Sequence, residues 1–309
     1  MSQNKEQTYV SAVAYLHNDA AQVQAFLTSL NLALSAHFVH YEIILVNDAS
    51  RDDSAAAVKN CVKTAPEKLP VTLVNMSVFQ GVELCMNAGI DAAIGDFIFE
   101  FDSLCEVGEE IIVKAYETAL TGYDIVSVSP QKNRNFLSGM FYRIFNACSA
   151  TQGKLQTDVF RVLSRRAINR VHAVSPTPVY RKAAYAASGL KMTVLRDKDA
   201  PKYGSNRPVR LSLAVDSLAL YTNAAYRFSL GIAGLMLLGT LGELIYTLAV
   251  YLGGAKPIEG WTTTMFVLTV GFFGVFAILA IVLKYLSLLV DLVFKHQRYL
   301  VENIEKLQK

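Results

Sequence analysis

The N-terminal part of the chain alternates short apolar runs with longer segments of mixed character. Four of the runs are rich in β-branched and aromatic residues, which is typical of buried strands, and cover residues 9–15, 41–47, 71–78 and 97–101. The segments between them have helical composition and cover residues 20–36, 54–65 and 81–93. This order predicts an α/β fold with a mostly parallel sheet and right-handed crossovers.

Two long apolar stretches follow in the C-terminal third. Residues 228–252 are interrupted only by Glu243, and residues 262–283 carry no charge. At about 1.5 Å per helical residue, either stretch is long enough to cross a hydrocarbon core of about 30 Å. The loop between them is short and rich in glycine, and Trp261 follows it in the position of an interfacial anchor. The sequence therefore predicts a transmembrane hairpin over residues 228–283.

Basic residues flank this hairpin on both sides, whereas its loop carries one Lys and one Glu. The flanking residues are Arg207, Arg210, Arg227, Lys284, Lys295 and Arg298. Because Lys and Arg are enriched in cytoplasmic loops, we expect both flanks in the cytoplasm and the hairpin in the inner (plasma) membrane. The start of the chain lacks the layout of a cleaved signal peptide, which also favours a cytoplasmic N-terminal part.

Two features of the predicted spans bear on function and assembly. Glu243 is a functional candidate because acidic side chains are rare within spans, but a hydrogen bond to a neighbouring helix or to water is the favoured explanation. Glycines at Gly231, Gly234, Gly239 and Gly242 suit close helix packing, so we expect a homo-oligomer.

Charge is distributed unevenly along the chain, although the net charge is only +3. Residues 1–124 carry 17 Asp and Glu against 6 Lys and Arg, whereas residues 154–210 carry 13 Lys and Arg against 3 Asp and Glu. A basic block before an apolar region indicates lipid headgroups or phosphate ligands, and a solvated basic face is the alternative. No nucleic-acid-binding motif accompanies the block, so we expect no nucleic acid partner.

The absence of several sequence motifs argues against some common enzyme chemistries. The chain has no glycine-rich phosphate loop after its first strand, no GxSxG elbow and no HExxH motif. Its four cysteines lack CxxC spacing and are expected to be reduced thiols. Acidic and amide residues follow the predicted strands instead. Carboxylates at strand ends can accept hydrogen bonds from a nucleotide or hold a divalent cation.

Four segments, taken in order, resemble family 2 glycosyltransferases with the GT-A fold. LVNDASRDDS at 45–54 is similar to the family's VDDGSxDxT, and residues 81–103 are similar to the segment that ends in D-x-D. DVFRVLSRRAINRV at 158–171 resembles the D-F-R-L-x-x-R segment. The hairpin and the residues after it resemble the end of membrane polyprenyl-phosphate glycosyltransferases, which are relatives of dolichol-phosphate mannose synthase.

The resemblance implies roles for residues at the strand ends. Asp48 would accept a hydrogen bond from the nucleobase, and Asn18 and Asp19 would line the nucleoside pocket. Asp52 would support the loop at this pocket, and Asp102 would bind Mg²⁺ or Mn²⁺ on the diphosphate of the donor. Helix N-capping is an equal alternative for Asp19 and Asp52.

The resemblance also implies a lipid phosphate acceptor. Such a phosphate is already ionised, so it can attack the anomeric carbon directly and invert it, and the protein contributes positioning and positive charge. The candidate cations are Lys132, Arg134, Arg161 and Lys202. Of these, Arg134 and Arg161 are expected to act with Asp102 in catalysis.

The chain departs from the family pattern at the metal site. Leu104 stands where the second aspartate of D-x-D is expected, and an apolar side chain cannot ligate a metal. Glu106, or Glu100 on the same strand face as Asp102, could supply the missing oxygen.

The sequence as a whole predicts a membrane-anchored glycosyltransferase that moves one sugar from a UDP-sugar or GDP-mannose to a polyprenyl phosphate. Its expected parts are a cytosolic GT-A domain, a membrane-surface helix, the hairpin and a C-terminal cytosolic helix, over residues 1–206, 207–227, 228–283 and 284–309. The alternative is a catalytically impaired relative that binds a lipid or a membrane partner. A processive polysaccharide synthase would need more spans and a QxxRW motif.

Overall fold

The computed structural model describes residues 5–66, 68–131, 154–174, 180–198, 260–294 and 299–307, together with Ala200 and separate residues within 140–147 and 231–245. The chain forms two compact units, one made of Met1–Ala214 and Gln297–Lys309 and the other of Val215–His296. The predicted membrane-surface helix at 207–227 lies outside the described residues.

The first unit contains an eight-stranded sheet in the order β7-β5-β6-β4-β1-β2-β3-β8. Its strands are β1 Val10–Leu16, β2 Tyr41–Asn47, β3 Val71–Met76, β4 Phe97–Phe101, β5 Ile125–Pro130, β6 Phe160–Ser164, β7 Met192–Asp197 and β8 Val301–Leu307. Strands β1 to β4 are parallel, as the sequence predicted, and β5 pairs with β7 in parallel. Because β6 and β8 run antiparallel to their neighbours, the sheet is mixed.

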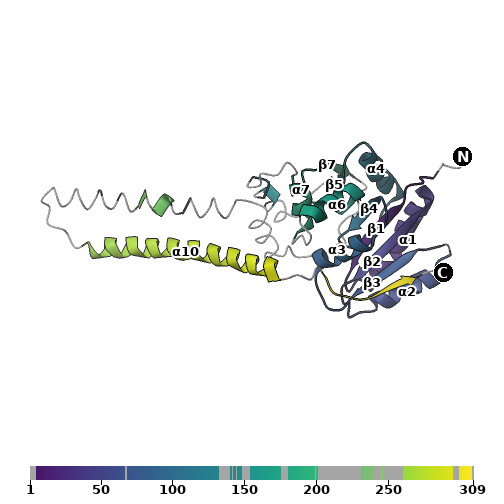
Figure 1. The fold of residues 1–309 in the computed structure, drawn as a ribbon, viewed down its shortest axis with the longest axis horizontal. Coiled ribbons are helices and arrows are strands. Elements are labelled where there is room, and N and C mark those ends of the chain that lie inside the picture. The colour runs from purple at the N-terminus through teal and green to yellow at the C-terminus, as the bar shows by residue number, and fades with distance from the viewer. Residues whose placement is uncertain are drawn as a thin grey trace. The chain divides into compact units, whose positions relative to one another are not determined.

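Helices cover both faces of this sheet, and the predicted α/β class is confirmed. They are α1 Ala20–His37, α2 Ser54–Thr64, α3 Val82–Ala92, α4 Glu109–Leu120, α6 Arg165–Val174 and α7 Arg181–Ala187. The three helices predicted between the first four strands match α1, α2 and α3 to within one residue at each end. Figure 1 shows these helices around the strands that they connect.

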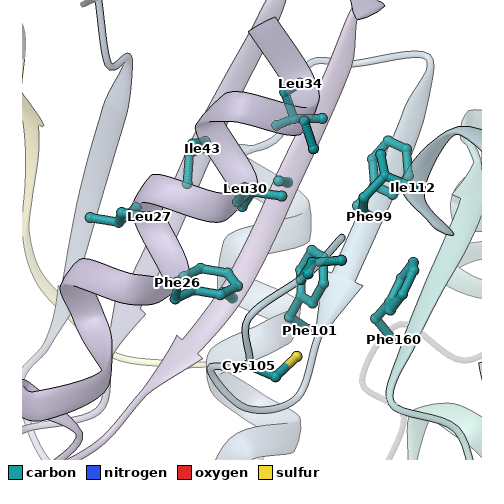
Figure 2. Packing of buried hydrophobic residues seen from close by; sticks show 14 of the residues in the cluster. Phe26, Leu27, Leu30, Leu34, Ile43, Phe99, Phe101, Cys105, Ile112 and Phe160 are labelled. Carbon is teal, nitrogen blue, oxygen red and sulfur yellow. The ribbon is translucent and has the colours of Figure 1, made fainter. Parts of the chain in front are cut away.

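The main hydrophobic core lies between the sheet and α1, α2 and α4. Figure 2 shows Leu27, Leu30 and Leu34 of α1 on the side of the core opposite Phe99 and Phe101 of β4. These side chains recur three and four residues apart on the helix and two apart on the strand, so each element turns one apolar face inward. Burial of this surface is the main favourable term in folding.

Helix α3 packs against the opposite face of the sheet, on β1 and β2. Gly89 allows the close approach, because a Cβ atom there would lie 2.7 Å from Cγ2 of Val46. The close packing holds the N-terminus of α3 at the carboxyl ends of the parallel strands, where ligands of such sheets bind.

The C-terminal segment differs from its prediction. The sequence predicted a cytosolic helix over residues 284–309, whereas helix α10 ends at Phe294 and Val301–Leu307 form strand β8. Strand β8, yellow in Figure 1, lies antiparallel beside β3. Without β8, β3 would be an edge strand with unpaired backbone groups, and this non-local pairing outweighs the local helical pattern.

The second unit contains α10, Trp261–Phe294, a helix of 34 residues. It covers the second apolar stretch that the sequence singled out, and most of the first stretch lies outside the described residues. Large apolar side chains on α10 are exposed, including Phe272, Phe273 and Phe276. In the described part of the chain, no helix combines the length and the apolar character needed to cross a membrane.

Candidate functional site

Asp48, the first residue after β2, is fully buried and accepts three hydrogen bonds. Its Oδ1 accepts from the Gln80 amide at 2.7 Å, and its Oδ2 accepts from the Gly81 amide and the Tyr15 hydroxyl, each at 2.8 Å. These bonds tie the start of α3 to the ends of β1 and β2. The protein thus satisfies this buried carboxylate internally, and its contact with a nucleobase stays a prediction.

Hydrogen bonds also join the loops that follow β1 and β2. Nδ1 of His17 lies 2.7 Å from the backbone oxygen of Asp48, and the Oδ1 of Asn18 accepts from the Arg51 amide at 2.8 Å. Asn18 and Ala49 have φ values of 53° and 47°, a left-handed conformation that is uncommon outside glycine. Surrounding contacts must hold such backbone in place, and it is frequent at binding sites. The two loops form a fixed rim at this edge of the sheet.

Asp52 links the starts of α1 and α2. Its carboxylate accepts from the Ala20 amide at 3.2 Å and from the Ser54 amide at 3.0 Å. Desolvation opposes its ionisation, but the hydrogen bonds from Ser54 and Ala20 lower the pKa of Asp52. Asp19, at the N-terminal boundary of α1, makes no capping bond with its side chain. The contacts of Asp52 therefore favour the helix-capping alternative for Asp52, and Asp19 shows no such capping contact.

Two buried arginines meet at the carboxyl end of β4. Arg161 lies on β6 and Arg181 is the first residue of α7, and both are 2% exposed or less. Each guanidinium donates to Glu100, within β4, and to Asp102, which follows the strand. We call the group the arginine cluster; it comprises Glu83, Glu100, Asp102, Asp158, Arg161 and Arg181.

The Nε atoms of the two guanidiniums are also paired. Nε of Arg161 donates to Asp158 at 2.6 Å, and Nε of Arg181 donates to Glu83 at 2.9 Å. Asp158 also forms an ion pair with Lys182. A fork of donors that meets several carboxylates fixes the orientation of each arginine, which a single ammonium group could not do.

These ion pairs set the protonation of Asp102. Burial opposes its ionisation, but the guanidiniums of Arg161 and Arg181 outweigh burial and hold the pKa of Asp102 well below its usual range. The same balance between burial and Arg161 lowers the pKa of Asp158. Both side chains are therefore carboxylates at neutral pH, and they keep the arginines charged.

The residues at the end of β4 do not fit a divalent cation. Both carboxylate oxygens of Asp102 already accept from guanidiniums, Oδ1 from Arg181 at 2.6 Å and Oδ2 from Arg161. Leu104 is buried in the hydrophobic core, and Glu106 is exposed. Within the described ranges, no three His, Cys, Asp or Glu side chains are grouped so that they could hold a metal ion.

A cavity of about 470 Å³ lies beside the arginine cluster and shares Asp158 and Arg161 with it, and Lys182, the ion-pair partner of Asp158, lines it too. Lys154 and Lys191 also line this cavity, as do Ser127 of β5 and Thr193 of β7. We call it the lysine cavity. The lining has more cationic side chains than acidic ones, since Asp158 is the one acidic residue among its described residues. This excess of positive charge favours an anionic ligand.

The sequence predicted some of these residues and missed others. Lys132, Arg134 and Lys202 lie outside the described residues, so their placement is not described. Arg161 was expected to contact a phosphate, and the structure pairs it with three carboxylates. Arg181 and Lys182 were missed, and their only sequence signal was their position within the basic block at 154–210.

A family model matches the part of the chain that contains the rim and the arginine cluster. The model of the family described as Glycosyl transferase family 2 matches residues 11–185, which run from β1 into α7. An uncharacterized glycosyltransferase of Synechocystis, sll0501, is 25% identical over 205 residues, which are 64% of this chain and 64% of that protein. The chain therefore spans slightly less than two thirds of that relative.

A second relative matches almost the whole chain. The undecaprenyl-phosphate 4-deoxy-4-formamido-L-arabinose transferase of Edwardsiella ictaluri is 24% identical over 318 residues, which cover 98% of this chain and 96% of that protein. Among solved structures, glucosyl-3-phosphoglycerate synthase from Mycobacterium tuberculosis, in complex with Mn²⁺, UDP and phosphoglyceric acid, has a TM-score of 0.51 at 13% identity. That similarity covers 69% of this chain and 76% of the other, and it concerns the fold.

Proposed function

Because the chain belongs to glycosyl transferase family 2, we propose that this glycosyltransferase moves one sugar from a nucleotide donor to a polyprenyl phosphate at a membrane. The observation that carries the proposal is the match, over 98% of the chain, to a relative named as an undecaprenyl-phosphate transferase. That match includes the apolar C-terminal third as well as the sheet, so it concerns both the catalytic fold and the part proposed to meet lipid.

The donor is proposed to bind at the rim formed by the loops after β1 and β2. Asn18 and Asp19 lie on this rim, Asp48 bonds to the loop before α3, and Asp52 bonds to the first residue of α1. A rigid rim supports nucleotide binding because little conformational entropy is lost when the ligand binds. Sugars carried by UDP or GDP, including GDP-mannose, are the proposed donors.

The acceptor phosphate is proposed to bind in the lysine cavity. Lys154, Lys182 and Lys191 supply positive charge there, and Arg161 joins the cavity to Asp102 at the end of β4. Lys132, Arg134 and Lys202 are further candidate cations for this phosphate. Because Arg161 both lines the cavity and bonds to Asp102, a phosphate bound there would lie near the end of β4, and the reaction requires the donor sugar to reach the same place.

The proposed reaction is a direct displacement with inversion. An oxygen of the lipid phosphate forms a bond to the anomeric carbon as the bond from that carbon to the nucleoside diphosphate breaks. The electron pair of the broken bond leaves with the diphosphate. Because the phosphate is already ionised, no protein base is needed, and the chain contributes positioning and positive charge.

The second unit is proposed to anchor the enzyme in the membrane. Exposed phenylalanines on α10, of which Phe273 is 75% exposed, support a lipid-facing role for this helix. The proposed organisation keeps a cytosolic domain at 1–206, a surface helix at 207–227 and a hairpin at 228–283. The basic residues on both flanks of the hairpin support a cytoplasmic active site.

Transfer assays test this function directly. The full-length chain in detergent is mixed with undecaprenyl phosphate and a panel of UDP-sugars and GDP-mannose labelled in the sugar. We expect label in the lipid fraction with one of these donors. The Arg166→Ala variant, which removes a largely exposed partner of Asp124, is a control that should retain transfer. Absence of both transfer and nucleotide binding would contradict the proposal and favour the non-catalytic alternative.

A further inference from the structure

The two arginines of the arginine cluster are arranged as a matched pair around Asp102. One Nη atom of each guanidinium donates to Glu100 and the other donates to Asp102, so two parallel bridges span the same pair of carboxylates. Glu100 lies in β4 and Asp102 directly follows the strand, and their shared partners show that both side chains point to the same side. The arrangement therefore places positive charge on both oxygens of Asp102.

Further contacts hold the two guanidiniums in these positions. Asp158 and Glu83 accept from their Nε atoms, and the Arg161 guanidinium lies 5.8 Å from the centre of the Tyr185 ring. The Tyr185 hydroxyl also donates to Glu100 at 3.2 Å. Because both guanidiniums are buried and bond to carboxylates, rotating either arginine away would leave buried charged groups without partners.

A divalent cation at Asp102 would meet three obstacles in this site. Its ligand oxygens are already used, the residue two positions on is the core residue Leu104, and two positive charges are in contact with the carboxylate. Binding a metal would require both arginines to move out of buried ion pairs. Mg²⁺ and Mn²⁺ prefer several oxygen ligands, which the described residues around Asp102 do not provide.

Asp102 nevertheless reaches the surface of the cluster. Its side chain is 20% exposed, whereas those of Glu100, Arg161 and Arg181 are 2% exposed or less. A ligand at the end of β4 would thus meet a carboxylate backed by two guanidiniums. Such a group can accept hydrogen bonds from hydroxyls, and its own charge is balanced from within the protein.

We propose that the end of β4 holds no divalent cation, because Arg161 and Arg181 already occupy both oxygens of Asp102, so that this chain binds its nucleoside diphosphate donor without a metal there. The inference rests on the proposed function in that the donor is a nucleotide. It makes Arg181 a positioning residue, which fixes the orientation of Asp102, and it removes the Mg²⁺ or Mn²⁺ ion that the resemblance had placed on Asp102.

Two measurements on the full-length wild-type chain test the inference. The first titrates UDP and GDP by calorimetry in EDTA and in excess Mn²⁺, and we expect affinities within about twofold, a difference well under 1.4 kcal/mol. The second titrates Mn²⁺ alone and follows the electron paramagnetic resonance of the free ion. We expect the wild type to show no saturable Mn²⁺ site that depends on Asp102, so the wild type and the Asp102→Asn variant should give the same titration.

Opposite results would overturn the inference. These are a nucleotide affinity that falls about tenfold or more in EDTA, or a saturable Mn²⁺ site that Asp102→Asn removes and Arg166→Ala retains. The Mn²⁺ titration contains no nucleotide, so it decides the inference even if the proposed function fails. The wild-type measurements also decide it if buried variants do not fold.

An arginine variant adds a specific readout. Arg181→Lys keeps one charge but cannot span Glu100 and Asp102 in the way a guanidinium does. We expect it to weaken UDP or GDP binding in EDTA about tenfold, and Mn²⁺ to give no recovery. Recovery of affinity by Mn²⁺ in wild type and variant alike would show that a metal acts at this position and would contradict the inference.

Discussion

The backbone amide of Gln80 donates to Oδ1 of Asp48 at 2.7 Å, and this bond joins the loop before α3 to the end of β2. The side chain of the same glutamine makes two bonds to the backbone of Leu300, from Nε2 to the oxygen at 2.8 Å and from the Leu300 amide to Oε1 at 2.9 Å. Leu300 directly precedes β8. The C-terminal segment of the first unit is therefore connected to the proposed donor rim through one residue.

Replacing Gln80 by Ala should loosen that connection. The change removes two hydrogen bonds to Leu300, and we expect unfolding free energy to fall by about 1 to 2 kcal/mol. We also expect nucleotide binding to weaken several-fold, because the loop that contacts Asp48 loses its support. Denaturant titration and calorimetry measure the two effects. Gln24→Ala, at an exposed position on α1, is the control that should change neither.

The Asp48→Asn variant tests whether the buried carboxylate organises the rim. Asp48 accepts from two amides and one hydroxyl, and an Asn side chain would present an NH₂ group to at least one of these donors. An unsatisfied buried donor costs about 1 to 3 kcal/mol, and we expect a loss at the upper end of that range. Equal denaturant midpoints for variant and wild type would contradict this role.

The Leu104→Asp variant restores the family's second aspartate in sequence, but we expect it to destabilise the protein. Leu104 packs in the hydrophobic core, and a carboxylate without a partner there should cost about 3 kcal/mol or more. Leu104→Met, which conserves volume, should cost less than about 1.5 kcal/mol. Denaturant titration compares the two. A stable Leu104→Asp variant that gains a Mn²⁺ site would show that this position faces the ligand.

The pH dependence of stability should report the ion pairs of Asp102. Because its pKa is lowered in the folded state, its contribution is complete above the unfolded carboxyl pKa of about 4 and is lost as pH falls below it. We therefore expect the difference in unfolding free energy between wild type and Asp102→Asn to be constant from about pH 5 to 8. It should shrink below about pH 4. A difference that grew on acidification would contradict the assignment.

Replacing a lysine of the lysine cavity should weaken binding of the acceptor phosphate and leave binding of the nucleotide-sugar donor unchanged. Lys191→Ala removes one cation from the lining, and we expect the KM for polyprenyl phosphate to rise about tenfold, since a charged hydrogen bond contributes about 1.5 kcal/mol. The KM for the nucleotide-sugar should stay unchanged. Steady-state kinetics with each substrate varied in turn measure both. Lys63→Ala, an exposed lysine of α2, is the matched control.

The sequence by itself determined the order of the first four strands and their helices, and their boundaries to within two residues. Their apolar periodicity is local, and burial of one face follows directly from it. The same period of two predicted that Glu100 and Asp102 point to one side, and in the structure both contact the same two guanidiniums, although Asp102 lies one residue beyond β4. The sequence also placed the polar residues Asn18, Asp48 and Asp52 in the loops that follow parallel strands.

Only the tertiary structure decided which groups surround Asp102 and what covers β3. Arg161 and Arg181 lie 59 and 79 residues from Asp102 along the chain, and no periodic pattern specifies a contact at that separation. Strand β8 likewise forms because the open edge of β3 offers backbone partners to a segment whose own pattern favours a helix. In both cases the deciding free energy comes from groups brought together by folding, such as buried charges that need partners and backbone amides that need acceptors.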